Sequence, residues 1–256
     1  MTALLRAEWR KVTTTRLGWG MLLGAIALAA LGVVAQIASN GSRGGGAFAL
    51  PLSASQTQKS IAASAASAYL FSVVVGIILI TTEFRHFTSR PTFLIEPRRG
   101  LVIVAKMLVA AVVGVVYGVV CAATSAAIMV PWLGAKGVTI HWIDGGVLES
   151  LLSAIAVIAI FAVVGIGVGV LVRNQIAAVI GALAYLFVLE PLIQIIPVIK
   201  NVYPYLPGAA AGAITGGGRA AGASLLSPWL GAVVLLGWGV LFAASGWILT
   251  IRRDIA

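Results

Sequence analysis

Six stretches of this chain are apolar over a length that suffices to cross a lipid bilayer. About 20 apolar residues form a helix as long as the hydrocarbon core is thick. Such stretches occur near 17–38, 62–82, 102–130, 151–172, 177–198 and 228–251. Only 9% of the 256 residues are charged, whereas a soluble domain carries about 25%. The sequence therefore predicts an all-α, multi-pass membrane protein in which residues 1–256 form a single transmembrane domain.

Basic residues are divided unequally between the segments that join these spans. If the N-terminus is cytoplasmic, 12 of the 17 basic residues fall on the cytoplasmic side. The positive-inside rule then places both termini in the cytoplasm, as six spans also require. The net charge of +10 is explained by cytoplasmic loops and contact with anionic membrane lipid. We expect no nucleic-acid partner, because no basic run is interleaved with aromatic residues.

Two segments outside the spans have a pattern of their own. In residues 1–16, Leu5, Trp9 and Val12 share one helical face, and the basic residues fall elsewhere. This pattern predicts an amphipathic helix at the membrane interface, with a charged leader before the first span as the alternative. Residues 199–227 contain Pro, Gly and short Leu/Ala stretches. We expect an outer loop there, between spans five and six, whose short helices re-enter the membrane.

The sequence contains no motif for hydrolysis or metal binding. No G-x-x-x-x-G-K-[ST] occurs, so the chain has no P-loop, and we expect that it is not itself an enzyme. G-x-S-x-G and H-E-x-x-H are also absent. Cys121 is the single cysteine, and His86 and His141 fall on opposite sides of the membrane in the predicted topology. Neither an internal disulfide nor a metal site is expected.

Three pairs of glycines lie four residues apart within the predicted spans. Two small residues at this spacing share a helical face and allow the backbones of two helices to approach each other. The pairs are Gly20 and Gly24, Gly114 and Gly118, and Gly165 and Gly169. Each pair predicts close helix packing.

Glu190 is the one acidic residue deep within a predicted span. An ionisable side chain at such a depth is costly and indicates a function, here in the transport pathway or an outer gate. The alternative is local, because the adjacent Pro191 interrupts the helix and the carboxylate can support that break. A role in transport predicts that Glu190→Gln alters transport and leaves assembly intact.

Residues 83–101 form the long charged segment of an otherwise apolar chain. Its apolar residues offer an anchor and its basic residues a charged rim, as transient protein interfaces often do. The candidate contact residues are Glu83, Phe84, Arg85, Arg90, Phe93, Leu94, Arg98 and Arg99. A solvated, positively charged cytoplasmic loop is the alternative. Glu83, at the membrane end, is placed to pair with Lys106 or Arg85.

This segment resembles the second cytoplasmic loop of ABC-2 type permeases, the membrane subunits of ATP-driven exporters. The matching run is Thr82-Glu83-Phe84-Arg85…Thr88…Pro91…Pro97-Arg98-Arg99…Ala105-Lys106. Weaker matches follow in the family's order: Glu8-Trp9-x-Lys11, Arg173-Asn174-Gln175-x-Ala177, Tyr205-Leu206-Pro207-Gly208 and Arg252-Arg253-Asp254. Phe87 departs from the family, in which small residues are common at that position.

The resemblance implies that the chain is half of a transporter. It would pair with a second permease chain, the same or paralogous, and with two copies of a separate ABC ATPase subunit that binds ATP and Mg²⁺. The segment 83–101 would be the coupling loop that docks on the ATPase, with the eight residues above as its contacts.

We therefore expect an exporter subunit that moves an unidentified, lipophilic or amphipathic cargo outward. The Ala, Gly and Val content and the excess of Arg over Lys point to a high-GC bacterium, and hence to the bacterial inner membrane. A non-transporting scaffold or sensor subunit that recruits a cytoplasmic partner is the alternative. An ion-coupled carrier would need more intramembrane charges and an internal repeat, which the sequence lacks.

Overall fold

The computed structural model describes residues 2–41, 51–85, 99–196, 201–216 and 225–253, and these residues form helices and turns without a strand. The α-helices are α1 (Thr2–Thr14), α2 (Arg16–Gly41), α3 (Ser55–Ala63), α4 (Tyr69–Arg85), α6 (Arg99–Ala135), α7 (Val147–Val172), α8 (Gln175–Ala184), α9 (Glu190–Ile195), α10 (Pro207–Thr215) and α11 (Pro228–Arg253). The predicted all-α class is confirmed.

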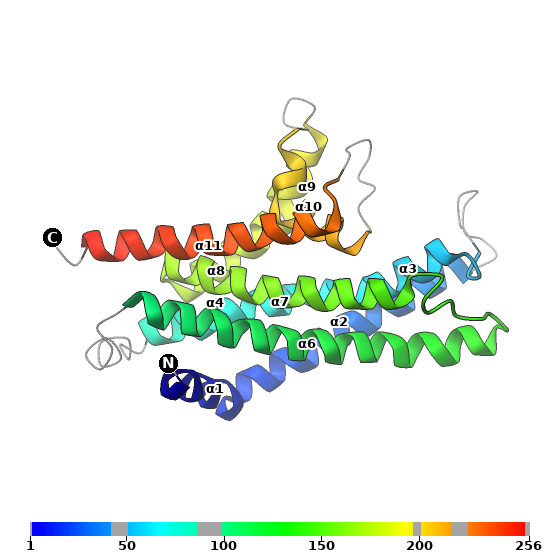
Figure 1. Ribbon diagram of the computed structural model, residues 1–256, viewed down its shortest axis with the longest axis horizontal. Coiled ribbons are helices and arrows are strands. Elements are labelled where there is room, and N and C mark those ends of the chain that lie inside the picture. The colour runs from blue at the N-terminus through cyan, green and yellow to red at the C-terminus, as the bar shows by residue number, and fades with distance from the viewer. Residues whose placement is uncertain (1, 42–50, 86–98, 197–200, 217–224, 254–256) are drawn as a thin grey trace.

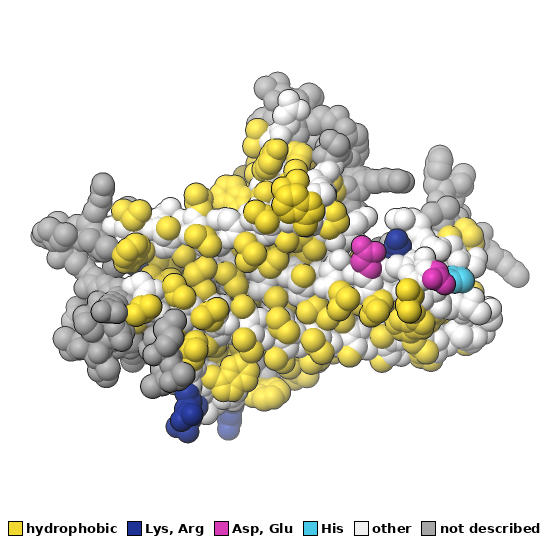
Figure 2. All heavy atoms as spheres, viewed as in Figure 1, with side chains coloured by type: hydrophobic (Ala, Val, Ile, Leu, Met, Phe, Trp, Pro, Cys, Tyr) yellow, Lys and Arg dark blue, Asp and Glu magenta, His cyan; other side chains and the backbone are white. Residues whose placement is uncertain are grey.

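Six stretches of the described chain are helical, long and apolar enough to span a membrane, as the sequence predicted. They are Arg16–Asn40, Ser55–Glu83, Gly100–Ala135, Val147–Val172, Gln175–Ile195 and Pro228–Ile248. The second joins α3 to α4 through a 3₁₀ turn at Ser64–Ala68. On the face in Figure 2, hydrophobic side chains cover the length of the bundle, and the charged side chains lie toward its two ends. This distribution suits helices that cross a bilayer.

Helix α7 lies at the centre of the bundle and packs against α4, α6 and α11 (Figure 1). Its glycines permit this packing. A Cβ atom at Gly165 would clash with the carbonyl oxygen of Val73 in α4 and lie 3.0 Å from the Cα of Gly76. On the opposite helix, a Cβ at Gly114 would lie 2.6 Å from the Cα of Ala159. The backbones therefore approach closely on both sides of α7, as the glycine spacing predicted.

The first glycine pair behaves differently. A Cβ at Gly24 would clash with the ring of Phe71 in α4, but a Cβ at Gly20 would meet nothing within 4 Å. Gly24 therefore makes room for an aromatic side chain of α4, and neither glycine of this pair brings two backbones together as predicted.

Both ends of the described chain lie at the same end of the bundle (Figure 1). Helix α1 and the last turns of α11 are found there, together with the end of α4 and the start of α6. The six candidate spans of the described residues, an even number, agree with this arrangement. That this end faces the cytoplasm remains a prediction.

The fifth span is not a straight helix. Asn174 caps α8, because its side chain accepts a hydrogen bond from the N–H of Ala177 at 3.1 Å. After α8 the chain forms a π-helical segment at Tyr185–Leu189, and the short α9 then leaves the bundle at a steep angle (Figure 1). The helix stops at Ile195, because the residue before a proline, here Ile196, prefers an extended backbone. The α-helical hydrogen-bond pattern is therefore interrupted just before Glu190, by the π-helical segment, and not at Glu190-Pro191, where α9 begins.

Two helices extend beyond the predicted spans. Helix α6 continues past 102–130 through Pro131 to Ala135, and α3 begins at Ser55, before the predicted span 62–82. A proline inside a membrane helix removes only one backbone hydrogen bond, which its surroundings can replace. The buried Gln58 holds α3 in place: its Nε2 donates to Thr139 O at 2.9 Å, and its Oε1 accepts from the N–H of His141 at 3.0 Å.

We expect Gly165→Val to lower the stability of the folded chain, because the Cβ would already clash with α4 and the two methyl groups beyond it have no room. Overpacking of this kind costs about 1–3 kcal/mol. Gly20→Val is the matched control, since the space beside Gly20 is open. Thermal unfolding in detergent micelles measures both variants. Equal melting temperatures for the two would contradict the packing described here.

Candidate functional site

A closed ring of four charged side chains joins three helices at the end of the bundle where α4 stops and α6 starts. Lys106 Nζ of α6 donates hydrogen bonds to Glu8 Oε2 and to Glu83 Oε1, both at 2.6 Å. Lys11 Nζ of α1 donates to Glu8 Oε1 at 2.7 Å and to Glu83 Oε1 at 2.6 Å. The two lysines and two glutamates balance in charge. We call these four residues the ion cluster.

The position of each residue in its helix brings the cluster together. Glu8 and Lys11 are three residues apart on α1 and therefore lie on one face of that helix. Glu83 stands two residues before the end of α4, and Lys106 lies about two turns inside α6. The surroundings of Lys106 are apolar, so its charge requires partners from other helices.

Three members of the cluster are buried and the fourth is half exposed. Lys106 is 2% exposed, Glu8 6% and Glu83 7%, whereas the side chain of Lys11 is 49% exposed. A buried charge without a partner costs several kcal/mol, so the three buried groups depend on one another. Solvent screens the pairs of Lys11, which contribute less.

The ion pairs shift the pKa values of the two α1 residues. Burial alone would raise the pKa of Glu8, but the charge of Lys106 and hydrogen bonds from both lysines hold it below its ordinary value of 4.5. Burial alone would lower the pKa of Lys11, but hydrogen bonds to Glu8 and Glu83 raise it above 10.5. The stabilisation is complete between these two ordinary values. It is lost as the pH falls through the folded pKa of Glu8 or rises through that of Lys11.

The pairing of Glu83 with Lys106 confirms one of the two partners that the sequence offered. The other, Arg85, lies in the last turn of α4, and its side chain is outside the described residues. The sequence reasoning missed Glu8 and Lys11 as partners. The one available signal was Lys106 itself, a single cation in the first turns of an apolar span.

The remaining candidate contact residues lie outside what the structure describes. This holds for Arg90, Phe93, Leu94 and Arg98, and for the side chains of Phe84 and Arg99. Their role in binding a partner stays a prediction. The structure does describe what anchors this segment on both sides, because the ion cluster joins the end of α4 to the start of α6.

Glu190 forms the second polar site. Its side chain is buried, at 4% exposed, and it caps the N-terminus of α10. Oε2 accepts from the N–H of Gly208 at 2.9 Å, and Oε1 accepts from the N–H of Ala209 at 2.7 Å. A carboxylate is favourable at a helix N-terminus, where unpaired N–H groups and the helix dipole attract negative charge.

A glycine makes this cap possible. A Cβ atom at Gly208 would lie 2.7 Å from Oε1 of Glu190, so a larger residue would displace the carboxylate. The cap links α9 to α10 across 18 residues of chain. This arrangement supports the local reading of Glu190, as a group that fixes the broken fifth span. A role in transport stays a prediction.

Neither polar site has the set of side chains that a metal centre needs. In the part of the chain that the structure describes, no three His, Cys, Asp or Glu side chains come together. Cys121 is buried in α6 and unpaired. The ion cluster and the Glu190 cap use their hydrogen bonds to join helices. Comparisons with family models, curated proteins and solved structures gave no match, so they identify no family.

We expect Lys106→Met to destabilise the chain strongly, because Glu8 and Glu83 would keep only the half-exposed Lys11. Removing one partner of a buried ion pair costs about 3–5 kcal/mol. Lys11→Met is the matched control and should cost about 1 kcal/mol or less. Unfolding in detergent measures both. The double variant Glu8→Gln/Lys106→Met should regain part of the loss; equal effects of the two single variants would refute a buried ring.

We expect Glu190→Gln to loosen α10, because an amide offers one acceptor oxygen to two N–H groups and sets its own NH₂ against the other. A hydrogen bond to a charged group contributes roughly 1.5–3 kcal/mol. Hydrogen exchange of the Gly208 and Ala209 amides should accelerate, while the amides of α7 keep their rates. Unchanged exchange in α10 would show that the cap is dispensable.

Proposed function

We propose that this chain is the permease subunit of an ABC-2 type exporter. It moves a lipophilic or amphipathic cargo outward across the bacterial inner membrane. ATP and Mg²⁺ are bound and used by two copies of a separate ATPase subunit, and a second permease chain, the same or paralogous, completes the transporter. The observation that carries this proposal is the ion cluster, which joins α1 to both helix ends that flank the charged loop.

The ion cluster fixes the two helix ends that flank the charged loop, so a partner that displaces the loop also displaces these helices. The loop follows the end of α4 and precedes the start of α6, and the ion pair between Lys106 and Glu83 holds these two helix ends together. The ion pair between Lys106 and Glu8 adds α1. Helix α1 joins the same junction. A displacement of the loop is therefore passed to three helices at once rather than absorbed by hinges at its ends.

Helices α4 and α6 can pass a displacement of the ion cluster on to the rest of the bundle. Helices α4 and α6 both lie against α7, and the glycine contacts leave no space for the helices to move independently. In this proposal Phe93 and Leu94 anchor the loop in the ATPase, and Arg85, Arg90, Arg98 and Arg99 form the rim around that anchor.

The topology belongs to the same proposal. Both termini and the charged loop face the cytoplasm. This agrees with the distribution of basic residues and with the common end of the bundle at which α1, the end of α4, the start of α6 and the end of α11 lie (Figure 1). At the other side, residues 199–227 form the outer re-entrant region. Helix α10 falls within this segment, and the cap from Glu190 holds it beside the fifth span.

The test is a mild-detergent purification of the tagged chain from its native membranes, with the bound proteins identified and quantified. We expect one ATPase subunit per permease chain. Phe93→Asp should lower the recovered ATPase more than tenfold, because a central interface residue contributes about 2 kcal/mol or more. Arg98→Glu, in the charged rim, should lower it by a smaller factor. Arg219→Glu, on the predicted outer side, is the matched charge reversal and should change nothing.

Each contrary result has a distinct meaning. If no nucleotide-binding protein is recovered, and a photocrosslinker at Phe93 also finds none, the exporter proposal fails. If an ATPase binds but its hydrolysis never responds to any membrane extract or candidate cargo, the chain is a scaffold. If Arg219→Glu is as damaging as Arg98→Glu, the proposed orientation is wrong.

A further inference from the structure

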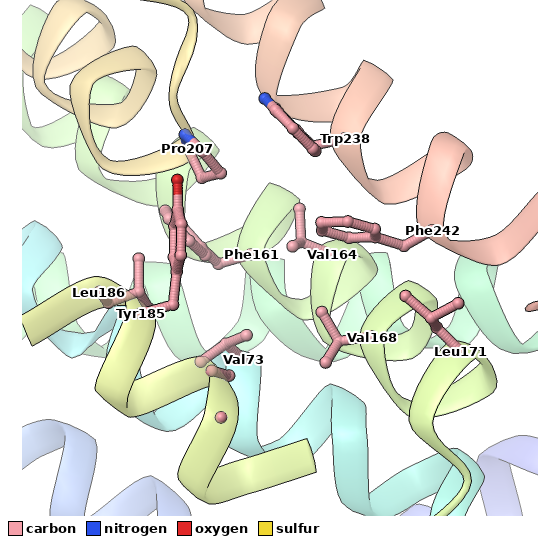
Figure 3. Close-up of a pocket in the computed structure, with 12 residues that line it drawn as sticks. Val73, Phe161, Val164, Val168, Leu171, Tyr185, Leu186, Pro207, Trp238 and Phe242 are labelled. Atoms are coloured by element: carbon pink, nitrogen blue, oxygen red, sulfur yellow. The ribbon is translucent and has the colours of Figure 1, made fainter. Parts of the chain in front are cut away.

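An apolar cavity of about 210 Å³ lies between α8 and α11, with α7 as its floor and the start of α10 at one end (Figure 3). Helix α8 packs on α4 and α7, and α11 packs on α7 and α10. The cavity occupies the space between α8 and α11. Residues that line it include Val73, Phe161, Val164, Gly181, Tyr185 and Phe242.

The local sequence explains why the space is open. Gly181 and Ala182 on α8 present almost no side chain to it, and a Cβ at Gly181 would meet nothing within 4 Å. The π-helical segment that follows begins at Tyr185 and sets the last lining residues of the fifth span out of α-helical register. The cavity therefore results from the small residues of α8 and from the π-helical segment. In most protein interiors, side chains would fill such a space.

Almost no polar group faces this cavity. The indole Nε1 of Trp238 donates to Tyr205 O at 2.8 Å and is satisfied. The Tyr185 hydroxyl points toward Pro207 at the α10 end (Figure 3), and no hydrogen bond joins it to any residue that the structure describes. A buried water needs two to four polar partners, and an apolar cavity that offers fewer stays dry.

The surroundings of the cavity are equally apolar. Ile180 beside it on α8 is 62% exposed, and Leu241 on α11 is 53% exposed. Both lie in stretches that are long and apolar enough to span a membrane, so in a bilayer their neighbours are lipid chains. An apolar cavity of roughly 150 Å³ accepts a benzene ring, and by that scale this one accepts about eight carbon atoms.

We propose that this cavity binds one alkyl chain, with a polar group of the ligand beside the Tyr185 hydroxyl. The acyl chain of a bilayer phospholipid and the tail of a single-chain amphiphile share this chemistry. The inference goes beyond the exporter proposal, because it requires no ATPase and no transport.

The experiment uses the full chain in phosphatidylcholine vesicles and two photoreactive probes. One is a phosphatidylcholine with a diazirine in an acyl chain, and the other is dodecanoic acid with a diazirine in its chain. After irradiation the labelled residues are mapped by mass spectrometry and normalised to the label on Leu23, which is 67% exposed on α2. We expect label on cavity residues such as Tyr185 and Phe242.

Two variants make the test specific. Gly181→Leu places a side chain in the cavity and should lower cavity labelling roughly tenfold, the change that about 1.4 kcal/mol of lost affinity produces. Gly237→Leu is the matched control on α11, since a Cβ there also meets open space but the residue does not line the cavity. Its labelling should equal that of the parent chain. Tyr185→Phe should lower labelling about threefold, as expected for one lost hydrogen bond.

The outcomes separate the possibilities. Cavity labelling by the phospholipid probe identifies a bilayer lipid as the occupant, and labelling by the single-chain probe alone identifies an amphiphile; either supports the proposal. Equal labelling of Gly181→Leu and the parent overturns it. The proposal is also overturned if Gly181→Leu lowers only the molecular mass of the assembled protein and leaves labelling unchanged. The cavity would then be an interface between copies of the chain. Failure to recover an ATPase would leave all of these results intact.

Discussion

The structure depends on the close approach of helix backbones around α7. Lipid is as apolar as the helices, so no hydrophobic force drives them together, and association rests on contact at short range. Gly76 and Gly165 make this possible between α4 and α7, since a Cβ on either would lie 3.0 Å from the Cα of the other. Gly114 does the same for α6, and Gly246 does so for α11. Three helices are thereby fixed to one central helix, and a buried hydrogen bond from Ser72 Oγ of α4 to Ile158 O of α7, at 2.6 Å, adds to one of these contacts.

The ion cluster acts on this frame from one end. Glu83 and Lys106 belong to helices that α7 already holds, so little conformational entropy is lost when they pair. The pair then receives Glu8 and Lys11 and fixes α1, an amphipathic helix that would otherwise lie free on the membrane surface. The ion cluster, and any coupling function that it has, therefore depends on the packing of α4 and α6 against α7.

The sequence predicted what depends on length and on single unusual residues. Six candidate spans followed from apolar runs. Charges at the edge of apolar segments offered Lys106 and Arg85 as partners of Glu83, and the structure shows the pair with Lys106. Glu8 was missed because only the tertiary path of α1 brings it to Lys106, 98 residues away. Glu190 stayed ambiguous because its partners, the N–H groups of a helix beyond Pro197, are backbone atoms that any sequence carries. The cavity depends on a π-helical segment, for which the sequence has no signal.

These features divide the described chain into a firm part and a loosely held part. In the most apolar stretch of α7, 67% of the residues are buried, against 11% in the fifth span. Local stability follows the number of buried contacts, so α8 and α9 are the elements that move at the least cost. Glu190 then has a clear physical role: it makes α9 and α10 move as one body. If the bundle changes shape, the change is concentrated beside the apolar cavity, where a bound alkyl chain would favour one position of α8 over another.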